Sequence, residues 1–129
     1  MRITLVNIIF CAWLLIMPGL AAASDQEDAT KAAQEILQSL QQGQFESLWN
    51  TQTSKFFQSR ITKDSFIANL AISRPQLGTP GASKRVDMAY SQTDPSTGFK
   101  GEIYAFNYLN SYSNGKFYER IVVVKETDG

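Results

Sequence analysis

The sequence predicts an α+β domain in which N-terminal helices pack on a twisted antiparallel sheet of three or more strands. Three observations favour this fold class. Apolar residues recur every three or four positions in the first half, which is the spacing of one helix face. In the second half they alternate with polar residues, as in half-buried strands. The motif Ser113-Asn114-Gly115 lies between two stretches rich in aromatic and β-branched residues and is a strong hairpin signal.

The first 23 residues have the pattern of a secretory signal peptide. Arg2 precedes an apolar run from Ile3 to Met17, and Ala21 and Ala23 fit the small-residue pattern of a cleavage site. We therefore predict export, to the periplasm, of a single domain spanning residues 24–129. The alternative is an uncleaved N-terminal membrane anchor, because an apolar segment of this length just suffices to cross a bilayer.

The composition excludes several kinds of chemistry. The chain has no histidine, and its single cysteine, Cys11, lies in the middle of the apolar leader, where it is badly placed for lipid attachment. A processed chain would lack disulfides, thiol nucleophiles, zinc sites of Cys and His, and an imidazole base. The 12 basic and 12 acidic residues form no block of one sign, so no binding to nucleic acid is expected. We expect no metal and no cofactor, and membrane contact only through the leader.

The first helix should begin at the capping residues Ser24 and Asp25 and stop at Gly43. A short second helix is expected over residues 44–49. The apolar stripe of the first helix, which would cover a sheet, consists of Ala29, Ala33, Ile36, Leu37 and Leu40.

Two further helical pieces are expected. One is a short amphipathic segment over residues 51–60. The other is capped by Thr62 and ends at Arg74-Pro75, because proline disfavours helix in the residue before it. The apolar face of this last helix should consist of Phe66, Ile67, Leu70 and Ala71.

Residues 76–83 contain two glycines and a proline and should form a loop. Strands are then expected over residues 85–90, 99–111 and 116–126, with a turn at residues 94–98. In the middle strand we assign the aromatic face to the core. This face consists of Tyr104, Phe106 and Tyr108.

The last strand should place Glu119, Ile121 and Val123 on one face. Val122 and Val124 would lie on the other face and be partly exposed, unless a partner covers them. Asp128-Gly129 is a tight-turn signal with no strand after it, so we expect either that a final C-terminal strand is lacking or that a partner fills the sheet edge.

A family resemblance rests on three segments. Phe45-x-x-Leu48-Trp49-Asn50, the run from Gly101 to Tyr104 and the run from Glu119 to Gly129 together resemble the bacterial exported family called domain of unknown function 4019. The resemblance covers nearly all of the chain after the leader. It implies a small exported protein of cystatin-like or nuclear-transport-factor-2-like architecture, whose members typically continue past the Asp-Gly turn into another strand. It implies no activity.

Folds of this shape often hold a ligand between helices and sheet. The candidate pocket residues are Trp49, Tyr90, Tyr104 and Tyr108, with Glu119 as the candidate catalytic residue. A carboxylate pointing inward among tyrosine hydroxyls could act as a base for proton abstraction. The alternatives are that Glu119 is solvated or paired with an Arg or Lys, and that Trp49 is a core anchor rather than a ligand-stacking residue.

Three functional hypotheses follow. The first is a non-enzymatic binding or accessory module for an unidentified protein or small molecule. The second is a small lyase- or isomerase-like enzyme that uses Glu119 and a tyrosine. The third is self-association as a homodimer through the exposed sheet edge.

Overall fold

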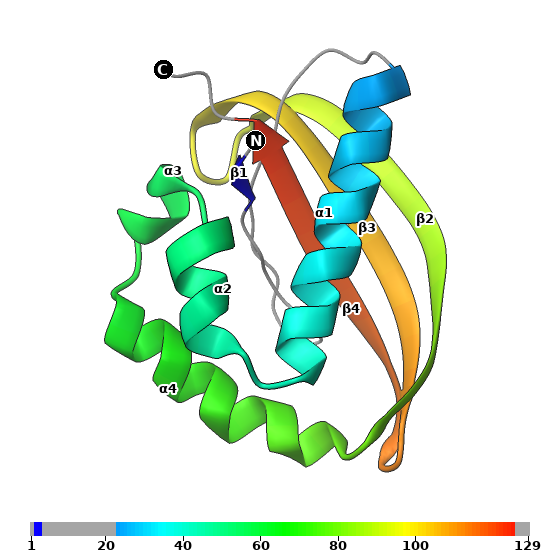
Figure 1. Ribbon diagram of the computed structural model, residues 1–129. Helices are drawn as coiled ribbons and strands as arrows, with labels where there is room; N and C mark the ends of the chain where they lie inside the picture. The colour runs from blue at the N-terminus through cyan, green and yellow to red at the C-terminus, as the bar shows by residue number, and fades with distance from the viewer. Residues whose placement is uncertain (1, 4–22, 126–129) are drawn as a thin grey trace.

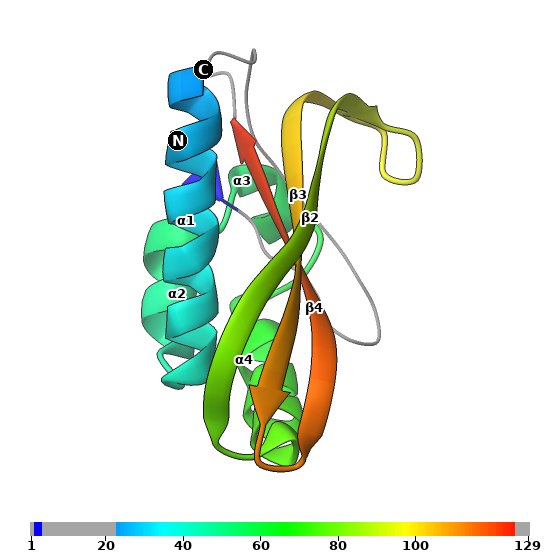
Figure 2. The same ribbon diagram turned by 90° about the vertical axis from the view of Figure 1, so that its right-hand side faces the viewer.

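The computed structural model describes residues 2–3 and 23–125 (Figures 1 and 2). Helices fill the first half of this range and strands the second, which confirms the predicted α+β class. In chain order the elements are β1 (Arg2–Ile3), α1 (Ala23–Gln41), α2 (Phe45–Gln52), α3 (Lys55–Gln58), α4 (Lys63–Ser73), the 3₁₀ helix η1 (Arg74–Leu77), β2 (Pro80–Asp94), β3 (Phe99–Tyr112) and β4 (Gly115–Lys125).

The described strands form one antiparallel sheet in the order β1-β4-β3-β2. The pairing of β3 with β4 is regular from Glu102↔Lys125 to Tyr112↔Gly115, so the chain turns through Ser113 and Asn114 as predicted. The β2–β3 pairing contains register shifts between Pro80 and Ser83, Arg85 and Asp87, and Ser91 and Thr93. Such irregularities increase strand twist, and both strands curve strongly in Figure 1.

Helix α1 covers one face of the sheet with the predicted apolar stripe. Its five stripe residues are at most 6% exposed, and the helix contacts β4 and β3. Figure 2 shows α1 and α2 on the same side of the sheet. Each fully buried Ile or Leu side chain of this stripe stabilises the fold by about 1.5–3 kcal/mol. The core therefore lies between α1 and the face of β3 that carries Tyr104, Phe106 and Tyr108.

Helix α4 begins where the cap predicted. The Thr62 hydroxyl accepts a hydrogen bond from the Ser65 amide at 3.1 Å, and the helix gives way at Arg74 to η1, with Pro75 near the start of η1. Phe66 is buried, but Ala71 is exposed, so the apolar face of α4 is narrower than predicted.

The predicted loop over residues 76–83 is too long at both ends. Leu77 belongs to η1, and β2 starts at Pro80 rather than at Arg85. Since β2 is the outer strand of the sheet, a proline at its first position need not interrupt a hydrogen-bonded ladder.

The prediction that Val122 and Val124 are partly exposed is wrong. Their side chains are 3% and 0% exposed, and Ile103 and Ala105, their partners on β3, are also buried. The residues from Ile121 to Val124 are all buried in succession, which is the pattern of a strand covered on both faces. The alternating pattern therefore failed at this end of the sheet.

Most of the predicted leader and the Asp128-Gly129 turn lie outside the described residues. The described residues of the leader are Ala23, at the start of α1, and those of β1, which pairs antiparallel with β4 through Arg2↔Val124 and Ile3↔Val123. Among the described residues, no helix is long and apolar enough to cross a bilayer.

Candidate functional site

The strand register places Glu119 on the inner face of β4. Its partner across the β3–β4 pair is Tyr108, and its side chain is only 1% exposed. Glu119 thus points inward, on the same face as the buried Ile121 and Val123, with which the alternation of β4 had grouped it. A buried carboxylate is costly unless it is paired and hydrogen-bonded.

Arg74 supplies the compensating charge. This residue opens η1 and is 8% exposed, and its Nη1 donates to Glu119 Oε2. Its Nη2 donates to the Tyr112 hydroxyl at 2.9 Å, and its guanidinium lies 5.8 Å from the centre of the Tyr112 ring. Glu119 is therefore buried and also ion-paired. Pairing with an Arg or Lys was one of the alternatives to a catalytic role.

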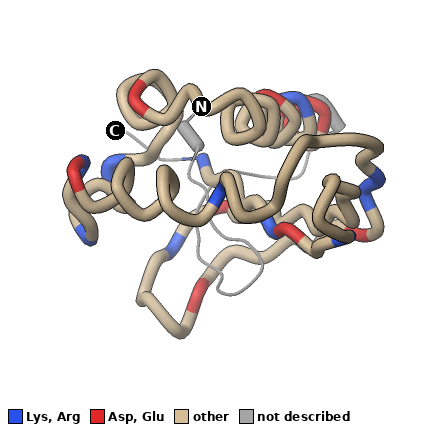
Figure 3. The backbone as a smooth tube through the Cα atoms, turned by 90° about the horizontal axis from the view of Figure 1, so that it is seen from below, with Lys and Arg blue, Asp and Glu red and all other residues tan. Residues whose placement is uncertain are grey.

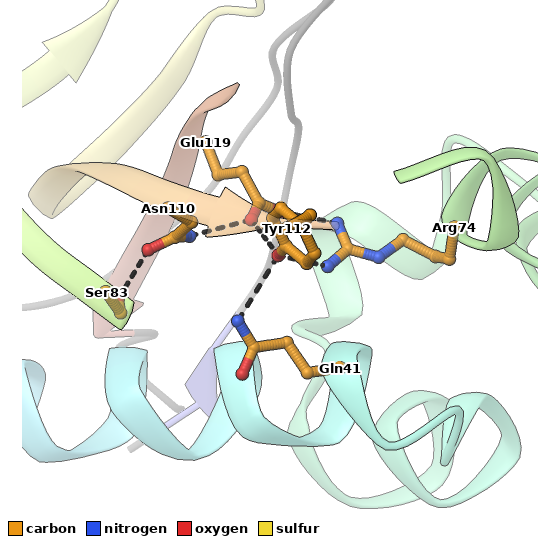
Figure 4. Close-up of polar contacts among 6 residues, drawn as sticks. All are labelled: Gln41, Arg74, Ser83, Asn110, Tyr112 and Glu119. Atoms are coloured by element: carbon orange, nitrogen blue, oxygen red, sulfur yellow. Dashed lines mark hydrogen bonds and ion pairs between the residues drawn. The ribbon is translucent and has the colours of Figure 1, made fainter. Parts of the chain in front are cut away.

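The second carboxylate oxygen is also occupied (Figure 4). Glu119 Oε1 accepts from the Tyr112 hydroxyl and, at 2.7 Å, from the side-chain amide of Asn110. Gln41 donates to the Tyr112 hydroxyl at 3.2 Å, and Ser83 donates to the Asn110 carbonyl oxygen. We call these six residues the Glu119 network: Gln41, Arg74, Ser83, Asn110, Tyr112 and Glu119.

The Glu119 network joins five elements: α1, η1, β2, β3 and β4. Burial, and then the hydrogen bond to Glu119, raise the pKa of the Tyr112 hydroxyl. This hydroxyl therefore stays protonated at neutral pH and acts as a donor to the carboxylate. Because both carboxylate oxygens of Glu119 accept hydrogen bonds, the network is suited to holding these five elements together rather than to acting as a free base.

The predicted pocket residues divide into separate groups. Tyr104 and Tyr108 lie in the core under α1, and within the described residues neither hydroxyl has a hydrogen-bond partner. Burial raises the pKa of Tyr108 to about 12. Tyr90 is 37% exposed on β2, and its ring centre lies 5.0 Å from that of Tyr104. Trp49 packs instead against helix residues, with its ring centre 5.2 Å from that of Phe66.

Two grooves lie apart from the Glu119 network. One of about 410 Å³ runs between α1 and β2, and one of about 420 Å³ lies beside Trp49. Neither is lined by Glu119, Tyr104 or Tyr108. The first is lined by Gln26, Glu27, Thr30, Lys31, Gln34 and Arg85, and the second by Trp49, Gln58, Ser59, Arg60, Ile61, Thr62 and Lys63.

The surface charge is mixed. Figure 3 shows basic and acidic positions interspersed along the tube in the view from below. Within residues 2–3 and 23–125, no group of three or more carboxylate, Cys or His side chains is arranged to hold a metal ion.

Comparison with models of known protein families identifies the family of this chain. A family model described as "Protein of unknown function (DUF4019)" matches residues 32–129. The chain belongs to the DUF4019 family. No curated protein and no solved structure matches this DUF4019 chain, so the cystatin-like and nuclear-transport-factor-2-like comparison stays a prediction.

Sequence reasoning missed most members of the Glu119 network. Tyr112 could have been placed on the inner face, because it lies an even number of residues from Tyr108 on one strand. Arg74 was recognised only as a helix end. It is 45 residues from Glu119, and no local pattern connects the two positions.

Proposed function

We propose that this DUF4019 protein is an exported, non-enzymatic binding module that takes up an extended segment of polypeptide along the outer edge of β4. One observation supports the proposal most directly. The edge of β4 already pairs with extended chain, because Arg2 and Ile3 lie antiparallel to Val124 and Val123. Export is supported by the leader pattern of residues 1–23.

The outer edge of β4 offers more room than β1 uses. Over residues 115–122, no strand of the described chain pairs with that edge. An edge strand presents a row of backbone N–H and C=O groups that can pair with an added strand. Strand addition of this kind is a recurring mode of peptide recognition, in which backbone hydrogen bonds supply much of the affinity.

The enzymatic alternative has weaker support. A general base needs a free oxygen within reach of its substrate. Both oxygens of Glu119 accept hydrogen bonds from protein groups, and the residue lines neither groove. A lyase- or isomerase-like role would require the Glu119 network to open.

Hydrogen exchange on the exported protein tests the binding proposal. The full-length gene is expressed in a bacterium, the exported form is purified, and amide exchange in β4 is followed with and without a peptide of the sequence Met1–Ile8. Strand addition predicts slower exchange in β4 and unchanged exchange in β2, the opposite edge of the sheet.

A matched control uses the same peptide with alternate backbone nitrogens methylated. This peptide keeps its side chains but loses donors that strand pairing needs, so it should not protect β4. Unchanged β4 exchange at millimolar peptide, or protection that appears in β2 instead, would contradict the proposal.

A further inference from the structure

We infer that the segment bound at the β4 edge is acidic: an extended peptide that carries carboxylates at alternate positions, opposite Arg120 and Lys116. This inference rests on the binding role proposed above and specifies the partner. It follows from the register that β1 adopts and from the side chains that share one face of β4.

The register of β1 fixes how a longer segment would lie. With Arg2 opposite Val124 and Ile3 opposite Val123, an antiparallel segment that continues along β4 meets Val122, then Arg120. Alternate positions further along would lie beside Tyr118 and Lys116. Side chains directly opposite one another in an antiparallel pair lie about 4.5–5.5 Å apart and interact.

One face of β4 carries Lys116, Tyr118, Arg120, Val122 and Val124, and the half of this face that begins at Lys116 is basic and exposed. Lys116 and Arg120 are exposed, Tyr118 between them is 64% exposed, and no acidic side chain of the described chain pairs with either cation. On the neighbouring strand, Asn107 lies opposite Arg120 and donates at 2.6 Å to Asp87. That carboxylate is therefore already engaged.

The near half of the same face is apolar. Val122 and Val124 lie beside Ala105 and Ile103 of β3, and all four are buried. A complementary segment therefore has aliphatic residues at its first alternate positions and carboxylates further along. Opposite charges directly across a strand pair are favourable, and like charges are unfavourable.

A second copy of this chain fits the edge less well. The charged residues of β4 are Lys116, Glu119, Arg120 and Lys125, and the single acid points inward to Arg74. Pairing β4 with another β4 would bring further cations to a basic edge, and lysine on an edge strand is a known device against self-pairing.

Three nine-residue peptides test the inference on the exported protein. The acidic probe is Ile-Thr-Ile-Thr-Glu-Thr-Val-Thr-Glu, and the two comparison peptides carry Gln or Lys in place of both Glu residues. Fluorescence polarisation of labelled peptides gives each dissociation constant. The Glu peptide should bind at least about tenfold more tightly than the Lys peptide, with a smaller difference at high salt.

Variants of the protein identify the cations responsible. The double substitution Lys116→Glu and Arg120→Glu should reverse the order of the Glu and Lys peptides, and that reversal would itself show that the variant is folded. The exposed Lys31 of α1 provides the matched control, because Lys31→Glu should leave the order unchanged.

The outcomes separate this inference from the proposed function. Equal affinity for the Glu, Gln and Lys peptides would overturn the acidic partner while leaving strand addition at β4 intact. Binding of none of the three would overturn both. A dimer that forms through β4 and excludes every peptide would overturn the acidic partner in favour of self-association.

Discussion

At the scale of single residues, Glu119 illustrates how one buried charge depends on its neighbours. Removing one partner of a buried ion pair leaves an uncompensated charge, whereas replacing both partners by apolar groups is often tolerated. Glu119 and Arg74 are 1% and 8% exposed, so they belong in this class.

Arg74→Met should therefore lower the free energy of unfolding by about 3–5 kcal/mol. The double variant Arg74→Met with Glu119→Leu should recover a large part of that loss, since neither charge remains buried. Urea denaturation of the single and double variants measures both effects. A loss below about 1 kcal/mol for Arg74→Met would contradict the view that this ion pair is needed for the stability of the fold.

Tyr108 gives a prediction about alkaline pH. Burial raises its pKa to about 12, whereas an unfolded tyrosine titrates near 10. Between these values the unfolded chain loses the proton and the folded chain keeps it, so stability falls as pH rises from about 10 to about 12. Below about pH 10 the contribution is fully present.

The parent protein should lose up to about 2–3 kcal/mol of unfolding free energy between about pH 10 and about pH 12 through Tyr108, and Tyr108→Phe should abolish this part of the loss. At pH 7 the variant should be no less stable than the parent, because the hydroxyl has no partner within the described residues. Chemical unfolding at pH 8, 10 and 11 makes the measurement, with Tyr118→Phe as the exposed control. An identical pH dependence of Tyr108→Phe and the parent would show the prediction to be wrong.

At the scale of elements, the tip of the β3–β4 hairpin is tied to the segment that leads from η1 into β2. The Ser113 amide donates to the Thr79 carbonyl at 2.9 Å, and the Asn114 amide donates to the Leu77 carbonyl at 3.1 Å. Gly78 lies between the two acceptors, with φ of +91° and no space for a Cβ, which would approach Ser113 Oγ to 2.1 Å.

Gly78→Ala should therefore destabilise the domain by more than about 1 kcal/mol, through backbone strain and through the displaced Ser113 side chain. Gly43→Ala is the matched control. Gly43 also has a positive φ, of +74°, but nothing lies within 4 Å of the position that a Cβ would take there, so it should lose stability from backbone strain alone. Thermal unfolding gives the decrease in Tm for each variant relative to the parent. An equal decrease in both variants would argue against a steric contribution at Gly78.

The elements also show what sequence reasoning can and cannot reach. The Thr62 cap, the hairpin at residues 113–115 and the face that Glu119 shares with Ile121 and Val123 depend on neighbouring residues, and each was predicted correctly. Arg74 was missed because its partner lies 45 positions away. The burial of Val122 depends on what covers the sheet, which strand periodicity does not encode.

At the scale of the whole molecule, the leader pattern of residues 1–23 gives a prediction about where the protein is found. We expect the exported protein to begin at Ser24, and mass spectrometry of the purified protein checks this against the 14.4 kDa of the full chain. Replacing both small residues, Ala21→Leu with Ala23→Phe, should block processing. Recovery of the unprocessed parent chain in the membrane fraction would favour the anchor instead.

The packing of α1 against β4 also bears on how the molecule is made. Helix α1, the first long helix, packs partly against β4, the last described strand, so this part of its apolar surface is buried only after β4 has been synthesised. Contacts between such distant segments slow folding, because a long loop must close before they form. A chain from which β4 has not yet emerged therefore lacks this part of the core, and such an incompletely folded state is compatible with the export that we propose.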